Sequence, residues 1–422
     1  MLVQTRLIAG CLMLAAALLL PGAAGAEDAP AQSAHPVATD ARLGGDGSQT
    51  RFILDLDRKI DIRAFLLGNP ERVVLDIPQV TFRLPARTGQ TGRGLVKAFR
   101  FGLVMQGGSR VVLDLGKPAK IEKAFVMEPA NGQPARLILD LAPTDRETFR
   151  RLVASDSRGA ESRAARDAYQ AAAQASAAAG APDSDPRPLI VLDPGHGGID
   201  PGAQTAGGET EKAIVLDFAL LLRDKLEKLG KYRVAMTRSD DTFVPLADRV
   251  AFARARQAAL FVSLHADSLP RRGDEVQGAS IYTLSDRASD AEAARLADSE
   301  NRADLVAGVD LSSEPDDVAG ILLDLAQRET RTFSAKFAHT LVGSMRGTVR
   351  LHKSPLKSAG FRVLRAHDVP SVLVELGYVS NRSDLKALTS DAWRNKTADA
   401  LVQAIGNFFG PRLVAGATAP EN

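Results

Sequence analysis

Three titratable side chains lie at the ends of apolar runs in the sequence. His196 follows the run "LIVLDPG", His265 ends "LFVSLH" and Glu375 ends "SVLVE". Runs of this length and composition are typical of buried strands. Ligands of open α/β sheets bind outside the carboxyl ends of the strands. We therefore expect these three side chains to meet at one edge of a sheet.

Glu211 is a fourth candidate, because it opens a helix-like pattern after the glycine-rich loop that contains His196. An acidic residue in the first turn of a helix interacts favourably with the helix dipole, which alone would explain Glu211. Two histidines and one carboxylate with an open fourth position, however, form the donor set of a catalytic zinc. Bound Zn²⁺ makes hydroxide available at neutral pH. An uncoordinated Glu375 would then be the general base.

The other histidines are expected not to bind the metal. His35 lies in a polar leader, and His339 lies within a helical pattern. His352 and His367 lie near loops without a carboxylate motif beside them, although both could line the cleft. His265 has an alternative interpretation as a core histidine, since it follows an apolar strand.

Three other functional classes lack support in the sequence. The glycine loop has no Lys-Ser/Thr pair and does not match G-x-G-x-x-G, which argues against a site for nucleotide phosphates. A serine hydrolase would need a G-x-S-x-G elbow, and none is present. The 53 basic and 51 acidic residues nearly balance, and aromatic residues make up only 5% of the chain. We therefore expect no nucleic-acid partner.

Strand-like and helix-like segments alternate from residue 188 onward. This alternation predicts an α/β domain with a mostly parallel sheet flanked by helices, over 188–412, before a tail at 413–422. The expected strands are 188–192, 232–238, 259–267, 278–285 and 371–381, and the expected helices are 211–229, 245–258, 318–345 and 391–409.

A pattern of Arg, three apolar residues and Asp occurs four times before this domain, at 51–57, 72–78, 110–116 and 136–142. The copies are short, β-rich and bounded by turn residues, and their spacing is too uneven for a solenoid. They predict a small all-β sandwich domain over 50–142. The Arg and Asp of each copy are either charges at strand edges or part of a ligand-binding surface.

The first 26 residues have the features of a secretory signal peptide. Arg6 precedes an apolar run of 14 residues, which is short for a membrane span of about 20. Ala24-Gly25-Ala26 fits a cleavage site, and the lack of a twin arginine favours the general secretory route. Cleavage after Ala26 would remove Cys11, the only cysteine. Thiol nucleophiles, disulfides and zinc–cysteine sites are thereby excluded from the exported chain.

Two segments have the composition of connectors. Residues 27–49 form a polar leader, and residues 143–187 are rich in Ala, Ser, Asp and Pro, as expected of a linker. No further run is long enough to span a bilayer, so we expect no membrane span.

The motifs "VLDPGHGGIDPGA", "EKAIVLDFALLLRDKL", "FVSLHAD" and "VLVELGYVSN" together resemble the zinc-dependent N-acetylmuramoyl-L-alanine amidases of cell division, the amidase-3 type. The repeat domain resembles the AMIN domain, which precedes these amidases and localises them by binding cell wall. The resemblance implies one Zn²⁺ held by His196, Glu211 and His265, with Glu375 as the catalytic carboxylate. Asp267 stands where the family often has Asn.

The resemblance also implies a function and a place of action. It implies hydrolysis of the amide between N-acetylmuramic acid and L-alanine in peptidoglycan, for cell-wall splitting at division in the periplasm. The acidic insert at about 286–317 resembles the segment that blocks the zinc cleft of division amidases until a LytM-domain activator displaces it. Glu300 is the candidate cap of the open zinc position, with a solvated acidic helix as the alternative. We expect a monomer.

Two other functions stay open from the residues alone. The same ligand set could serve a zinc peptidase or deacetylase acting on another amide. Alternatively, the chain could be a wall-binding protein that keeps the fold without activity. The presence of all four site residues speaks against this second alternative.

Overall fold

The computed structural model describes residues 35–85, 87–105, 107–156, 185–268, 276–308 and 321–416. The expected signal peptide with Cys11, linker residues 157–184, insert residues 309–317 and tail residues 417–422 lie outside the described residues. Within the described ranges, no helix combines the length and the apolar character that crossing a bilayer requires.

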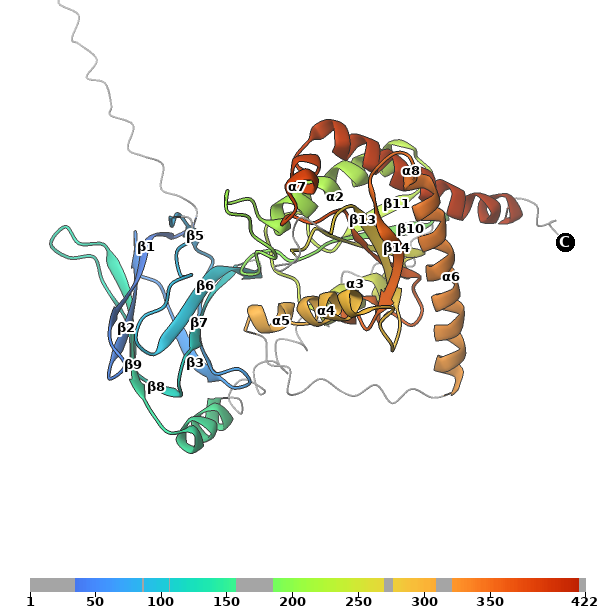
Figure 1. Ribbon diagram of the computed structural model, residues 1–422. Helices are drawn as coiled ribbons and strands as arrows, with labels where there is room; N and C mark the ends of the chain where they lie inside the picture. Colours follow the sequence, from blue (N-terminus) through green and yellow to red (C-terminus); the bar gives the residue numbers. More distant parts are fainter. Residues whose placement is uncertain are drawn as a thin grey trace, which may run out of the picture. The chain divides into compact units, whose positions relative to one another are not determined.

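The N-terminal domain is all-β, as predicted, and consists of two sheets (Figure 1). The strand order is β5-β1-β2-β9-β8 in one sheet and β3-β4-β7-β6 in the other. Apolar side chains from both sheets share one buried core. The strands are β1 (Val37–Gly45), β2 (Thr50–Leu56), β3 (Arg63–Leu67), β4 (Arg72–Pro78), β5 (Thr81–Phe82), β6 (Val96–Met105), β7 (Gly108–Leu115), β8 (Ala119–Met127) and β9 (Ala135–Pro143).

The four copies of the repeated pattern pair with one another in antiparallel register. In each pair, the Arg of one copy lies opposite the Asp of the other, β2 with β9 and β4 with β7. Arg51 reaches Asp140 at 2.6 Å, and Arg110 reaches Asp76 at 2.6 Å. The intervening apolar residues alternate into the core. The Arg and Asp residues of the repeat therefore stabilise strand pairing through cross-strand ion pairs.

Two boundaries of this domain differ from those we expected. Residues 37–45, assigned to a polar leader, form β1 and pair with β2. Most of β1 is only half-buried, so its polar residues hide the strand pattern. Residues 146–156, assigned to the linker, are helical, and Phe149 anchors them in the β core.

The C-terminal domain is α/β, as predicted, with the sheet order β11-β10-β12-β15-β13-β14. Neighbouring strands from β11 to β15 are parallel, and β13 is antiparallel to β15. The strands are β10 (Leu189–Pro194), β11 (Arg233–Met236), β12 (Leu260–His265), β13 (Ala279–Leu284), β14 (Leu351–Ala359) and β15 (Ser371–Glu375).

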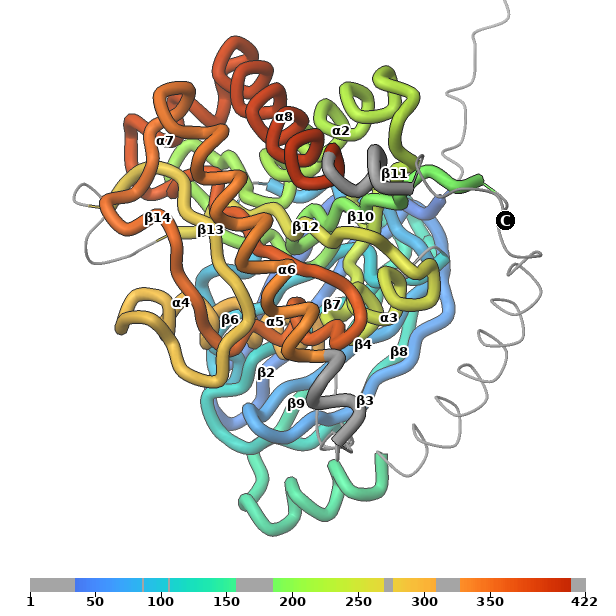
Figure 2. Tube along the Cα trace, turned by 90° about the vertical axis from the view of Figure 1, so that its right-hand side faces the viewer, coloured from blue at the N-terminus to red at the C-terminus, as the bar shows by residue number. Residues whose placement is uncertain are grey.

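Helices cover both faces of this sheet. One face packs against α2, α6 and α8, and the other against α3, α4 and the 3-10 turn η1. Helices α2 and α8 lie side by side (Figure 1 and Figure 2). The helices are α2 (Glu211–Lys228), α3 (Leu246–Ala255), α4 (Ala291–Glu300), α5 (Ala303–Val306), α6 (Ile321–Met345), η1 (Arg362–Leu364), α7 (Arg382–Leu388) and α8 (Asp391–Gly416).

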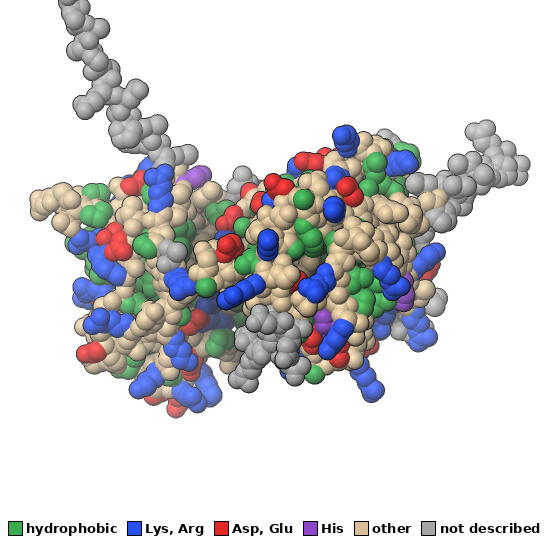
Figure 3. Space-filling view, turned by 45° about the horizontal axis from the view of Figure 1, so that its top comes forward, with side chains coloured by type: hydrophobic (Ala, Val, Ile, Leu, Met, Phe, Trp, Pro, Cys, Tyr) green, Lys and Arg blue, Asp and Glu red, His purple; other side chains and the backbone are tan. Residues whose placement is uncertain are grey.

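Cationic and anionic side chains are interspersed on the face of the molecule shown in Figure 3. The mixture agrees with a formal net charge of only +2. No single-sign field that would concentrate a polyanion is evident on this face.

The carboxyl ends of β10, β12 and β15 lie next to one another, because these strands are parallel neighbours. Pro194 pairs with Leu264, and His265 pairs with Glu375. The sheet therefore delivers the loop of His196 to the same edge as the other two candidate residues.

Candidate metal centre

The loop after β10 holds His196 in an unusual backbone conformation. His196 has φ of 58°, which places a non-glycine residue in the left-handed region. The buried guanidinium of Arg249 donates to the carbonyl oxygens of Pro194 and His196, each at 2.8 Å. A Cβ at Gly195 would lie 2.4 Å from Cε1 of His265, so glycine is required there. These contacts fix the position from which the imidazole projects.

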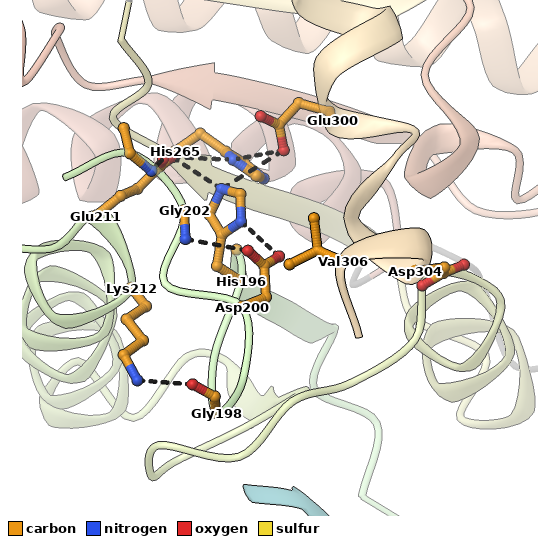
Figure 4. A network of polar contacts seen from close by, with 12 residues as sticks. His196, Gly198, Asp200, Gly202, Glu211, Lys212, His265, Glu300, Asp304 and Val306 are labelled. Carbon is orange, nitrogen blue, oxygen red and sulfur yellow. Dashed lines mark hydrogen bonds and ion pairs between the residues drawn. The ribbon is translucent and has the colours of Figure 1, made fainter. Parts of the chain in front are cut away.

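Four side chains converge at this edge of the sheet (Figure 4). Oε1 of Glu211 lies 3.2 Å from Nε2 of His196 and 3.2 Å from Nδ1 of His265. Oε2 of Glu300 lies 3.2 Å from Nδ1 of His265 and 3.6 Å from Nε2 of His196. All four side chains are buried. Two imidazoles and two carboxylates therefore surround one point.

Hydrogen bonds with residues outside this group orient two of the four side chains, His196 and Glu211. Oδ2 of Asp200 lies 2.8 Å from Nδ1 of His196, which leaves Nε2 to face the centre. The carboxylate of Glu211 accepts hydrogen bonds from the amides of Ala203 and Ala266, each at 2.9 Å. A carboxylate behind a ligand histidine is a common support of metal sites. Asp200 was not predicted from the sequence, although its spacing of four residues from His196 in the Asp-Pro loop is a signal for such a contact.

Several buried carboxylates lie close together at the centre. Burial raises the pKa of Glu375 well above its usual value, and the carboxylates of Glu211 and Asp267 raise it further. Burial also acts to raise the pKa of Glu211, but His196 and His265 outweigh it and hold that pKa well below the usual range. Crowded buried carboxylates are costly when ionised without a counter-charge. A divalent cation at this point would offset that cost.

Glu375 has a different environment from the other carboxylates. Its Oε2 accepts a hydrogen bond from the amide of Asp267 at 3.2 Å. Its Oε1 is buried and has no hydrogen-bond partner among the described residues. A buried oxygen of this kind is costly unless it has a function or a partner. It is available to a water or a substrate atom.

The donor set fits a zinc ion. The ligand atoms of His196, His265 and Glu300 all lie within 4.8 Å of one another, and these residues form a group that could hold a metal. Oε1 of Glu211 approaches both imidazoles as closely as Glu300 does. Imidazole nitrogen and carboxylate oxygen both suit Zn²⁺. The structure thus brings Glu211 and Glu300 to the same point. From the sequence, Glu211 was expected to be a zinc ligand and Glu300 only a candidate cap.

The remaining histidines contact other groups. His352, which we expected could line the cleft, lies 3.6 Å from Glu292 and contacts the carbonyl of Ser354. His367, expected likewise, contacts Arg254 at 2.9 Å. Neither side chain joins the four that converge at the centre, in agreement with the expectation that neither binds the metal. His339 bonds to the carbonyl of its own helix turn, and His35 is exposed on the β domain.

Each of the two domains matches a known protein family. Residues 190–407 match the Amidase_3 family, described as N-acetylmuramoyl-L-alanine amidase. The chain belongs to the N-acetylmuramoyl-L-alanine amidase family. Residues 40–142 match the AMIN domain. The family assignment made from the four motifs is confirmed, and the AMIN match includes most of β1.

Relatives within the amidase family extend over both domains. N-acetylmuramoyl-L-alanine amidase AmiC of Neisseria meningitidis is 33% identical over 386 residues, covering 90% of this chain and 91% of the relative. AmiC of Escherichia coli is 33% identical over 377 residues, covering 87% and 88%. AmiA of Escherichia coli is 39% identical over 222 residues, covering 52% of this chain and 76% of the relative.

Proposed function

We propose that the chain is a zinc-dependent amidase that hydrolyses the bond between N-acetylmuramic acid and L-alanine in peptidoglycan. The observation that carries this proposal is the convergence of His196, His265 and Glu211 beside Glu375, in a chain of this amidase family. Zinc would polarise the scissile carbonyl and make hydroxide available at neutral pH. His196, Glu211 and His265 would hold the ion.

Glu375 would move the proton in this reaction. Its unpartnered Oε1 accepts a proton from the attacking water as the new C–O bond forms. The same oxygen then gives that proton to the L-alanine nitrogen as the C–N bond breaks. The amide of Asp267 keeps the other oxygen in place.

The closed position of Glu300 supports autoinhibition. Glu300 is the last residue of α4, and its carboxylate lies against both imidazoles, where it could fill the position that a catalytic zinc keeps open for water. We propose that a LytM-domain activator withdraws α4 at cell division. The AMIN domain would bind peptidoglycan, and the chain would act as a monomer in the periplasm after removal of residues 1–26.

Digestion of purified peptidoglycan sacculi tests the reaction. Metal-loaded Glu300→Ala protein should release intact stem peptides with a free L-alanine amine, and the same protein with Glu375→Ala added should release none. Free acetate would identify a deacetylase, and cleavage within the stem would identify a peptidase. If Glu300→Ala also releases nothing, the chain is a wall-binding module.

Deletion of 287–317 tests autoinhibition separately. Basal hydrolysis of sacculi without an activator should rise, because the deletion removes α4 and Glu300. The folded state of the deletion variant is checked by its circular dichroism. Unchanged activity in a folded deletion variant would contradict autoinhibition but not the amidase reaction.

A further inference from the structure

Residues 305–308, in the described part of the insert that carries Glu300, contact arginines of the β domain. The guanidinium of Arg72 donates to the carbonyl of Leu305 at 2.6 Å, and Arg100 donates to the carbonyl of Val306. Arg110 donates to the next two carbonyls, of Ala307 and Gly308, at 3.0 and 3.2 Å. Arg72 is only 1% exposed. Three arginines therefore donate hydrogen bonds to four consecutive carbonyl oxygens.

Apolar contacts accompany these hydrogen bonds. Ala307 is fully buried in a small cluster with Val74 and Val112 of the β domain and Phe243 of the catalytic domain. A Cβ placed on Gly308 would lie 3.1 Å from a methyl group of Val112 and 3.2 Å from one of Val74. Such close approach at one point of the insert indicates a fitted contact.

Two of these carbonyls, of Leu305 and Val306, belong to the four-residue helix α5. The last carbonyls of a helix have no partner within the helix. Hydrogen bonds from a charged donor are about twice as strong as neutral ones. Arg72 and Arg110 belong to the repeated pattern, and Arg110 binds these carbonyls while it also pairs with Asp76. In the other copies, Arg51 and Arg136 lie beside Asp140 and Asp55 on the second sheet.

The contact is connected to Glu300 by a short, well-anchored segment. The side chain of Asn301 bonds to the carbonyl of Gly360 at 2.9 Å and to the amide of Arg362 at 2.8 Å. The buried carboxylate of Asp304 accepts from the amide of Leu246, at the start of α3, at 2.9 Å. Release of residues 305–308 would remove one of the anchors of a segment that begins beside the metal centre.

We propose that the β domain has a second function, as a clamp on the inhibitory insert. Its arginines hold residues 305–308 and so stabilise the position of Glu300 in the metal centre. This inference rests on the proposed autoinhibition by Glu300. It makes the β domain part of the control of the catalytic site, in addition to its proposed binding of cell wall.

Ala307→Lys tests the clamp without altering either core. A lysine cannot fit the buried cluster, so the variant should raise basal release of stem peptides by at least about fivefold, the lower end of typical coupling between sites. Asp298→Lys is the matched control, because it places the same side chain at an exposed position of α4. The control should keep the wild-type rate, and equal unfolding temperatures would show that both variants are folded.

A disulfide lock provides a readout that does not depend on activity. Apart from Cys11 in the expected signal peptide the chain has no cysteine, so Val112→Cys with Gly308→Cys offers one pair. Oxidation should link the two residues, as non-reducing peptide mapping would show. The linked protein should resist activation until it is reduced.

The outcomes separate the clamp from the amidase reaction. If no link forms and Ala307→Lys keeps the wild-type rate while Glu300→Ala is active, the clamp is wrong and the proposed function stands. If Glu300→Ala is also inactive, the proposed function fails. If the disulfide forms although Glu300→Ala is inactive, residues 305–308 do contact the β domain. The proposed control of the metal centre by this contact would then be wrong.

Discussion

At the residue scale, the centre depends on side chains behind the ligands as well as on the ligands. Asp200 holds Nδ1 of His196, and Arg249 holds the backbone of the loop. His196, His265 and Glu375 were predictable because each follows an apolar strand. Asp200 could have been found from its spacing of four residues from His196, but Arg249 could not, because its partners include backbone carbonyls of a left-handed turn far away in the sequence.

Asp200→Asn should weaken zinc binding by about 10- to 100-fold, the usual cost of losing such a support. The amide cannot stabilise the imidazole as a carboxylate does, although its size is nearly the same. Competition with a chromophoric chelator measures the affinity. Asp240→Asn, at an exposed position of a nearby loop, should leave it unchanged. Equal affinities for both variants would remove Asp200 from the site.

Arg249→Met should lower the free energy of unfolding by about 3–5 kcal/mol, because it leaves a buried charge unpaired. Arg249 pairs with the fully buried carboxylate of Asp193 at 2.7 Å. Urea unfolding followed by circular dichroism measures the change. Arg365→Met, at an exposed position, should shift the midpoint very little. A similarly small shift for Arg249→Met would show that Asp193 is stabilised by other groups.

At the element scale, α4 is held at its start by a buried cation. Asp290 caps α4 through two backbone amides. Lys357 of β14, only 5% exposed, lies 3.4 Å from Asp290 and 2.5 Å from Glu292. A helix in this insert was predicted only from the resemblance to the amidase family. Strand β14, against which α4 packs, was not predicted from the sequence. The polar pattern of β14 gives no strand signal by itself.

Lys357→Met should loosen α4, because two carboxylates lose their buried partner. Hydrogen–deuterium exchange should become faster in peptides covering 291–306, and basal amidase activity should rise with it. Lys353→Met is the matched control on the same strand, where the lysine is exposed. Equal exchange in the two variants would show that Lys357 does not secure the helix.

At the scale of the whole molecule, the two domains have separate hydrophobic cores, one between the sheets of the β domain and one on each face of the catalytic sheet. The sequence predicted this division from a change in period, from short repeated strands to alternating strands and helices. It could not predict the contact between Ala307 and the β domain, because that contact joins residues far apart along the chain through backbone carbonyls.

Metal removal should therefore affect one domain more than the other. A ligand present at 100 times its dissociation constant stabilises the folded state that binds it by about 2.7 kcal/mol. Scanning calorimetry of the chain with zinc, and after chelation, should show a lower unfolding temperature for the catalytic domain alone. Equal shifts of both transitions would mean that the domains unfold as one unit.

Glu300 has a consequence for the supply of the ion. Two imidazoles and the carboxylates of Glu211 and Glu300 surround one point, so the chain offers four donors, the number that a four-coordinate zinc would take. Complete sets of this kind are typical of structural rather than catalytic zinc. If Glu300 caps the site as proposed, the protein would lose its ion to competing chelators more slowly than a variant without that carboxylate. Glu300 would then both restrain the proposed reaction and slow the loss of metal.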